Sequence, residues 1–437
     1  MGTNINQWLT NCTRRRFLGI VAGGTGVTVG PMVLSPFAWS PLVGTRSSRG
    51  EERAVVIIQL TGGNDALNTV IPFEDPAYHR ARPTLRSVTD KAKPVSDSLA
   101  LHSAFAPCEE LLKDKVLTIL QGVGYPNSSR DHGQALRDWQ TAVPGDPMER
   151  AGWVGRACDH LAFETFALAP AVFVGTMQLP LTLVGTRSIV PTIRRVEDLI
   201  PGISAFSSAS TTERTGSSSS GRKNTPNPRG LREFLQRTAA AADQAANRVA
   251  KVLEKRAIPP VALRYELQRR LEVIATIIEA RVGIQFFYTD LGGPEPGGFD
   301  THANQADNHA ALLTELAWGL AHFHRRTEAS GLSQAVLVMT FSEFGRTLHE
   351  NGRRGTDHGA ATCLFLLGGG LKGGIIGAHP SLTNLDQGGL RYHTDFRSLY
   401  RTMLEDWLGI PAAAIFGWEN FAKLPILKPE AALIPSA

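Results

Sequence analysis

The chain has 437 residues, of which 42% are hydrophobic and 19% are charged. A chain of this length and apolar content can bury a sizeable core, which excludes a small disulfide- or metal-stapled scaffold and a wholly disordered protein. The formal net charge of +5 comes from 45 basic and 40 acidic side chains, so the position of the excess decides whether a polyanion partner is implied.

Three consecutive arginines, Arg14 to Arg16, stand directly before the apolar run 17–24 near the N-terminus. Glycines interrupt that run, which is too short and too weak to span a bilayer. The stretch 13–18 resembles a twin-arginine export signal, which predicts a signal peptide and linker over residues 1–45 and passage through the twin-arginine translocase. We therefore expect a periplasmic or secreted protein, with no stable membrane span in the rest of the chain.

The basic excess belongs largely to this N-terminal segment. A nucleic-acid-binding arm is the alternative interpretation, but apolar residues follow the arginines where solvated residues would be expected. Cleavage just after Trp39 would leave 42 basic side chains against 40 acidic ones. Because a nearly neutral protein has no strong affinity for polyanions, we expect no nucleic-acid partner.

The remaining chain is expected to form one domain over residues 51–425. Cys108, Cys158 and Cys363 are sparse and lack paired spacing, so at most one disulfide is expected and the core must stabilise the fold. A Ser-rich stretch at 204–230 predicts a disordered surface insertion, because α/β pattern lies on both sides of it.

Strands and helices are predicted to alternate along this domain. Continuous runs rich in β-branched residues indicate buried strands, and segments with one apolar face indicate helices. Strands are expected at 54–60, 116–120, 284–288, 335–340 and 362–367, and helices at 108–112, 231–255, 261–282 and 304–327. This order predicts an α/β fold with a mainly parallel sheet covered by helices on both faces. Ligands bind such sheets outside the carboxyl ends of the strands.

Side chains that bind metals follow or precede these predicted strands. In chain order they are Asp65, Asp131 with His132, Asp300 with His302 and His309, Glu343, Asp357 with His358, and His393 with Asp395. Oxygen and nitrogen ligands without thiolate suit zinc, manganese, magnesium or calcium, and several Asp with several His suit two adjacent divalent ions better than one. Two metals about 4 Å apart can bind both the attacking and the leaving oxygen of a displacement at phosphorus, or at sulfur by analogy.

Each of these residues also has a plainer interpretation. Asp65 is of a type that turns favour, and Asp300 could cap the helix after it. A lone histidine on a helix is more often exposed than a ligand, and His309 is the weaker candidate of its pair. Glu343 could form an ion pair with Arg346. The most specific feature is the pair Asp357-His358 within Thr356-Asp357-His358-Gly359. Because this pair lies between two residues that favour tight turns, both of its side chains can face one ion.

Three motifs resemble an exported, sulfatase-like family catalogued as domain of unknown function 1501, within the alkaline-phosphatase-like superfamily. They are Gly-Gly-Asn-Asp at 62–65, Gly-Phe-Asp-Thr-His at 298–302 and Thr-Asp-His-Gly at 356–359. Further matches are Tyr78 with Arg82-Pro83, and the stretches 125–127, 152–156, 342–347, 373–377 and 394–409. The resemblance covers the chain from about Val55 to Gly409 and implies an alkaline phosphatase/sulfatase-like fold.

The resemblance also implies roles for single residues. Asp65, Asp357 and His358 resemble the ligands of one metal, and Asp300 with His302 resembles the pair of a second metal, which His393 would complete. The family's Arg-Ser-His-Phe segment, which would hold the nucleophile, reads Arg130-Asp131-His132-Gly133 here. The candidate catalytic residues are therefore Asp131, Ser129 and His132. The chain has no Cys-x-Pro-x-Arg sequence from which formylglycine could be made.

Two functions remain open at this point. The first is an exported metal-dependent hydrolase that acts on a phosphate or sulfate ester of a small molecule or polysaccharide. The second is a catalytically inactive relative that binds a ligand, a surface polymer or a partner protein. Asp131 separates them, because a carboxylate in the place of the serine either takes part in the chemistry or marks its loss.

Overall fold

The computed structural model describes residues 52–161, 170–186, 190–194, 251–253, 263–293 and 297–433. The predicted signal peptide at 1–45 and the Ser-rich insertion at 204–230 lie outside these residues. The helix predicted at 231–255 is described only at 251–253, which are helical. All described residues belong to one compact unit, which comprises residues 50–212 and 242–437.

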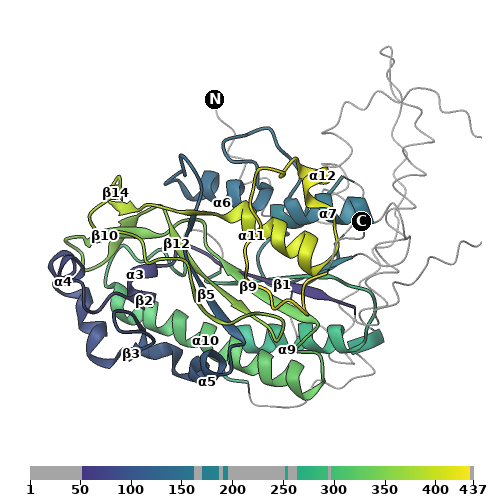
Figure 1. Cartoon of the computed structure of the whole chain (residues 1–437), viewed down its shortest axis with the longest axis horizontal. Coiled ribbons are helices and arrows are strands. Elements are labelled where there is room, and N and C mark those ends of the chain that lie inside the picture. The colour runs from purple at the N-terminus through teal and green to yellow at the C-terminus, as the bar shows by residue number, and fades with distance from the viewer. Residues whose placement is uncertain are drawn as a thin grey trace, which may run out of the picture. The chain divides into compact units, whose positions relative to one another are not determined.

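A nine-stranded sheet runs through the centre of this unit (Figure 1). Its strands lie in the order β13-β5-β12-β9-β1-β8-β6-β7, and β16 pairs with β5. The strands are β1 (Ala54–Leu60), β5 (Leu117–Gly124), β6 (Ala171–Val174), β7 (Thr192–Ile193), β8 (Phe286–Leu291), β9 (Val336–Phe341), β12 (Thr362–Leu367), β13 (Gly374–Ile376) and β16 (Thr394–Asp395). All neighbours pair in parallel except β12, which is antiparallel to both β5 and β9.

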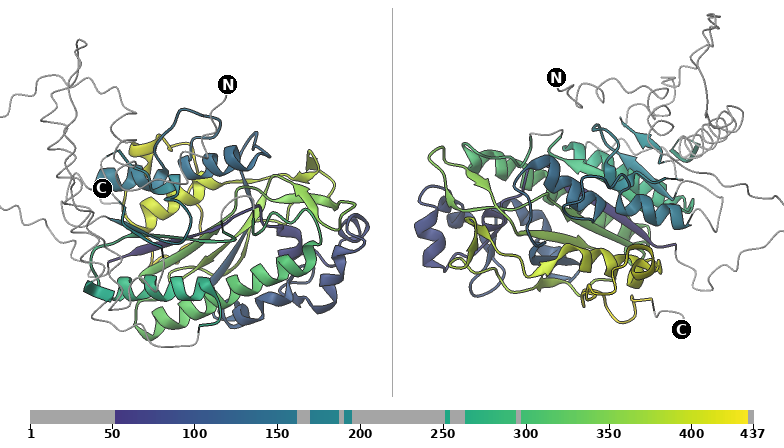
Figure 2. Two further views of the ribbon diagram at one scale, coloured as in Figure 1. Left: turned by 180° about the vertical axis from the view of Figure 1, so that it is seen from behind. Right: turned by 90° about the horizontal axis from the view of Figure 1, so that it is seen from above.

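Helices cover both faces of the sheet, as Figures 1 and 2 show. One face carries α5 (Glu109–Lys113), α9 (Glu266–Glu279) and α10 (Gln305–Ala329), and the other carries α6 (His132–Thr141), α7 (Trp153–Leu161), α11 (Phe396–Thr402) and α12 (Ala412–Phe416). Successive side chains of β1 point to opposite faces, so Val56 and Ile58 join one apolar core and Val55 and Ile57 join the other. The sheet is therefore buried on both sides, as its continuous apolar strands require.

Two small sheets flank the large one. The first has the order β11-β10-β15-β14 and the second the order β2-β4-β3. Their strands are β2 (Val70–Ile71), β3 (Lys93–Pro94), β4 (Ala100–Leu101), β10 (Arg346–Glu350), β11 (Thr356–His358), β14 (Leu385–Asp386) and β15 (Gly389–Leu390). The remaining helical segments are α3 (Ala66–Thr69), α4 (Pro76–Ala81), 3₁₀ turns at Leu85–Lys91, Ser103–Cys108 and Leu181–Leu183, and a π-helical turn at Met403–Trp407.

The structure confirms the α/β class and the mainly parallel sheet. The strands expected at 54–60 and 362–367 are β1 and β12 to the residue, and β5, β8 and β9 begin one or two residues after the expected position. The helix expected at 108–112 begins at Glu109, because Ser103–Cys108 is a 3₁₀ turn that contains Pro107. Cys108, Cys158 and Cys363 are buried free thiols, so the described residues form no disulfide. No helix among the described residues is long and apolar enough to cross a membrane.

Candidate metal centre

The carboxyl ends of the parallel strands meet at one edge of the sheet. Asp65 follows β1, His132 follows β5, Asp300 follows β8 and Glu343 follows β9. Because β12 is antiparallel to its neighbours, its start lies at this edge instead of its end. That reversal explains why His358, which precedes β12, belongs to the same region.

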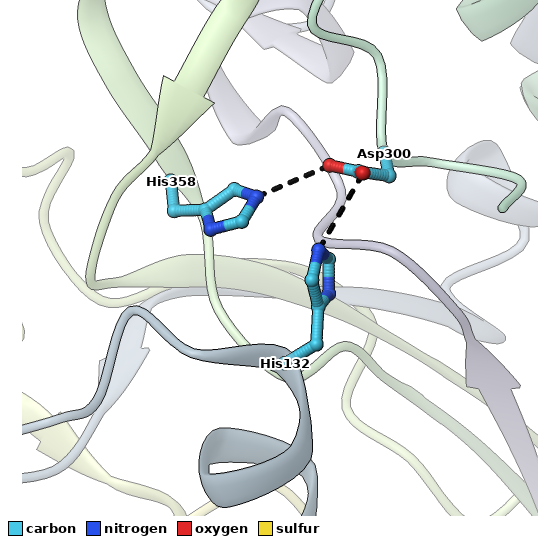
Figure 3. A group of neighbouring side chains, drawn as sticks. All are labelled: His132, Asp300 and His358. Atoms are coloured by element: carbon cyan, nitrogen blue, oxygen red, sulfur yellow. Dashed lines mark hydrogen bonds and ion pairs between the residues drawn. The ribbon is translucent and has the colours of Figure 1, made fainter. Parts of the chain in front are cut away.

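Four side chains converge at this edge, and we name His132, Asp300, His302 and His358 the His–Asp cluster. One ligand atom from each of His132, Asp300 and His358 lies within 4.8 Å of the other two (Figure 3). Asp300 Oδ1 is 3.1 Å from Nε2 of His358, and Asp300 Oδ2 is 3.5 Å from Nε2 of His132. Nε2 of His302 is 3.1 Å from Asp300 Oδ1 and 2.8 Å from Nε2 of His358.

Each imidazole of the cluster has an oxygen acceptor at its other nitrogen. Nδ1 of His132 is 3.1 Å from Glu343 Oε1, and Nδ1 of His302 is 3.1 Å from Asp357 Oδ1. Nδ1 of His358 is 2.7 Å from the main-chain oxygen of Arg130. Since ionised carboxylates and carbonyls only accept hydrogen bonds, each Nδ1 donates, and in a neutral ring Nε2 then carries the lone pair.

The neutral ring form is favoured at His358, where burial lowers the pKa of the imidazole. Its Nε2 lone pair then faces both Asp300 Oδ1 and the Nε2 of His302, at distances where two acceptors repel each other. A divalent cation between these atoms would turn the repulsion into coordination. Metal-bound histidines almost always donate their second nitrogen to an oxygen in this way. The donor set of three imidazole nitrogens and one carboxylate thus fits zinc or another first-row divalent ion.

Asp300 is held in its ionised form. Burial alone would raise the pKa of this carboxyl, but the hydrogen bond and charge of Arg346 lower it. Arg346 reaches Asp300 Oδ1 at 2.8 Å. The loop before Asp300 packs tightly on Gly62, where a Cβ would lie 2.3 Å from the Asp300 nitrogen and where φ is +110°. Only glycine fits there, so the Gly-Gly-Asn-Asp motif supports the position of Asp300.

Two of the residues expected to bind metal have other partners. Both carboxylate oxygens of Asp65 are bound by Arg82, and Asp65 also caps α3 through the Leu67 nitrogen. Both ring nitrogens of His393 are engaged, one with Thr394 Oγ1 and one with the Ala378 carbonyl, each at 2.9 Å. The group able to hold a metal among the described residues contains neither of them.

Two of the candidate catalytic residues, Ser129 and Asp131, form the cap of α6. Asp131 Oδ1 accepts from the Gln134 nitrogen at 2.9 Å, and Ser129 Oγ accepts from the Asp131 nitrogen at 3.0 Å. His132, the first residue of α6, is the candidate catalytic residue that lies in the His–Asp cluster. Asp357 lies at the rim with its side chain 60% exposed and accepts from Asn351 as well as from His302.

Glu343 and Arg346 have different partners from those the sequence suggested. Arg346 pairs with Asp300, while Glu343 Oε1 accepts from the Gly62 nitrogen at 2.7 Å and faces His132. Both side chains are fully buried. The signal available in the sequence was their place in the short segment that follows the buried strand β9, because a charged residue buried there must be paired within the fold.

Replacing Glu343 by glutamine is expected to weaken metal binding about 10-fold, because the amide holds the His132 ring less firmly than the carboxylate does. Titration of the metal-free protein with Zn²⁺ and calorimetric detection would measure the change. Glu110→Gln is the matched control, since the Glu110 side chain is 74% exposed. Equal affinity in the two variants would show that Glu343 does not position His132.

His309 is a core residue that changes how stability depends on pH. Its Nε2 lies 3.0 Å from Asn64 Oδ1, and burial lowers its pKa from 6.5 to about 3. Between these two values the unfolded chain binds a proton that the folded chain does not, so the free energy of unfolding falls as the pH is lowered below 6.5. The contribution of His309 is about 1.4 kcal/mol per pH unit.

In the His309→Gln variant, the free energy of unfolding is expected to fall less steeply as the pH is lowered from 6.5 to 4. The difference in slope from the wild type should correspond to about one bound proton. Urea unfolding at a series of pH values measures this slope. The exposed His349 offers the control variant His349→Gln, which should keep the slope of the wild type. An unchanged slope in His309→Gln would contradict the assignment.

Comparison with known proteins gives a family and a set of distant structural likenesses. Residues 140–416 match a family described as "Protein of unknown function (DUF1501)". No curated protein matches the chain. The C-terminal periplasmic domain of EcEptC from Escherichia coli, in a complex with Zn, is similar at 12% identity and a TM-score of 0.36, covering 74% of each chain.

Two further solved structures show a likeness of the same order. A sulfatase from Pseudoalteromonas sp. is 8% identical with a TM-score of 0.38, over 88% of this chain and 73% of that one. A protein in the alkaline phosphatase superfamily from Vibrio parahaemolyticus is 11% identical with a TM-score of 0.32, over 92% and 76% of the two chains.

Proposed function

The chain belongs to the family of proteins of unknown function DUF1501, and we propose that it is a metal-dependent hydrolase of phosphate or sulfate esters. The observation that carries this proposal is the convergence of three imidazole Nε2 atoms on the carboxylate of Asp300. The motif resemblance to the alkaline-phosphatase-like superfamily supports the ester as the class of substrate. Small-molecule esters and polysaccharide esters both remain within this proposal.

His132, His302, His358 and Asp300 would hold the ion. A divalent cation there supplies Lewis-acid polarisation of an ester oxygen. Glu343, Asp357 and the Arg130 carbonyl keep the three rings oriented through their Nδ1 atoms. His132 also begins α6, so the positive end of that helix dipole lies beside the cluster and favours an anionic phosphate or sulfate group.

The attacking oxygen in this proposal comes from water. Asp131 and Ser129 are bound to main-chain groups of the α6 cap, and neither is oriented as a free nucleophile. Asp131→Ala should therefore lower stability through loss of the cap, by about 1 kcal/mol, and leave the rate per folded molecule close to that of the wild type.

The test is metal content together with turnover. The purified protein is expected to contain a divalent ion, and hydrolysis of aryl phosphate or aryl sulfate esters should stop on chelation and return when Zn²⁺ or Mn²⁺ is added. Absence of turnover across both ester classes, in protein that holds its metal, would reject the hydrolase and favour a second function.

That second function is a non-catalytic relative which binds a ligand, a surface polymer or a partner protein. It is favoured by one observation, the use of Asp131 as a helix cap where the resembling family places a serine. Tight metal binding without turnover supports it, and robust turnover excludes it.

We also propose that the protein is exported through the twin-arginine translocase to the periplasm or beyond. The support is the stretch 13–18, in which Arg14 and Arg15 precede an apolar run. Changing both arginines to lysine should retain the protein in the cytoplasmic fraction of expressing cells. Unchanged export of that double variant would contradict this route.

A further inference from the structure

An arginine is paired with Asp65, the residue that the motif resemblance assigns to one of two metals, together with Asp357 and His358. Asp65, which follows β1 and caps α3, has a side chain 1% exposed, and the Arg82 side chain beside it is 0% exposed. Arg82 Nη1 is 2.6 Å from Asp65 Oδ2, and Arg82 Nη2 is 3.0 Å from Asp65 Oδ1. This is the two-pronged pairing by which a guanidinium binds a carboxylate most strongly.

No coordinating site of Asp65 is left for an ion. Its two oxygens accept four hydrogen bonds, from Arg82 Nη1, Arg82 Nη2, the Leu67 nitrogen and Gln305 Nε2. A carboxylate has about four lone-pair sites, so all of them are used. Burial alone would raise the pKa of Asp65, but the charge and hydrogen bond of Arg82 lower it, and the carboxylate stays ionised without a metal.

All of the hydrogen-bond donors of Arg82 are paired as well. Its five N–H groups have five acceptors: two Asp65 oxygens, Asn68 Oδ1 and the main-chain oxygens of Thr347 and Leu348. The pair is also tied to the His–Asp cluster, because Gln305 bonds both Asp65 and Thr356, the residue two before His358. The guanidinium thus supplies at Asp65 the positive charge that a second ion would otherwise bring.

We infer that the chain binds one divalent ion, in the His–Asp cluster, and that the Arg82–Asp65 pair takes the structural place of a second. This rests on the proposed function for the identity of the first site. The sequence pattern of several Asp with several His favoured two ions, and the buried arginine is the physical reason to expect one.

Metal stoichiometry tests this inference separately from the proposed function. The full-length protein, expressed and then freed of metal with a chelator, would be titrated with Zn²⁺ by calorimetry, and its metal content as purified would be measured by mass spectrometry. One ion per chain supports the inference. Two ions per chain would overturn it while the proposed function stands, and no ion would overturn the proposed function itself.

Two variants locate the ion. Asp65→Asn, which replaces the carboxylate beside Arg82 with an amide of the same size, is expected to retain one ion per folded chain. His358→Ala is expected to retain none. Circular dichroism and thermal unfolding establish which protein is folded, and if Asp65→Asn does not fold, the stoichiometry of the wild type alone decides. A folded Asp65→Asn protein without metal would contradict the inference.

Discussion

His358→Ala is expected to abolish metal binding and to lower kcat/KM for aryl esters by about 10³-fold. The ring is the central member of the His–Asp cluster, with its Nε2 3.1 Å from Asp300 and 2.8 Å from His302. Removal of a ligand deprives the transition state of several kcal/mol of charge stabilisation. Because the ion binds only the folded protein, 100 Kd of Zn²⁺ should stabilise the wild type by about 2.7 kcal/mol and the variant not at all.

The chain offers a matched control for that substitution. His349 is an exposed histidine on β10, nine residues from His358, and His349→Ala should keep the metal content, the rate and the Zn²⁺-dependent stability of the wild type. If His358→Ala kept half or more of the wild-type activity with a full complement of metal, the His–Asp cluster would not be the site of the chemistry.

Most of the central sheet could be predicted from local sequence, because its strands are buried on both faces. Runs such as 54–60 and 362–367 are apolar at all but one position, and that pattern follows from burial on both faces. The strands β6, β7, β13 and β16 are only two to four residues long, and even the apolar run of β6 is too short to stand out in the sequence. They exist because a neighbouring strand offers unpaired main-chain groups, which is a property of the folded molecule.

One general rule was enough to predict which part of the sheet carries the site. Ligands collect at the carboxyl edge of a parallel sheet, and this rule placed His132, Asp300, His302 and His358 in one region. It could not choose among the acidic residues at that edge. Asp65 and Asp300 both follow strands and precede helices, and each is bound by an arginine, yet three imidazoles surround Asp300 alone.

What decided between these two carboxylates is long-range pairing. Arg82 reaches the main-chain oxygen of Leu348, 266 positions away, and His132 reaches Glu343, 211 positions away. Such contacts depend on how loops pack once the sheet is formed, and no periodicity in the chain encodes them. In the sequence, Arg82 and Arg346 stood out only because they belong to two of the motif matches, Tyr78 with Arg82-Pro83 and the stretch 342–347.

Arg346→Met is expected to lower the free energy of unfolding of the metal-free protein by about 3–5 kcal/mol. The Arg346 side chain is fully buried, and its donors bind Asp300 and the main-chain oxygens of Gly62, Gly63, Phe299 and Thr356. Methionine fills the volume but satisfies none of these acceptors. The Asp300 carboxylate would then lose its guanidinium partner, and the buried main-chain oxygens of Gly62 and Gly63 would lose the donor that Arg346 supplies.

Urea unfolding in the presence of a chelator measures this loss without a contribution from bound metal. Arg353→Met is the control, because Arg353 is exposed and its substitution should change stability by less than about 0.5 kcal/mol. Arg346→Lys should remain nearly as unstable as Arg346→Met, since an ammonium group with three donors cannot reach five acceptors held by three different segments of the chain. A loss for Arg346→Met as small as that of the control would mean that the segments carrying Gly62, Asp300 and Thr356 hold their positions without the arginine, and that Asp300 is oriented for the ion by the backbone alone.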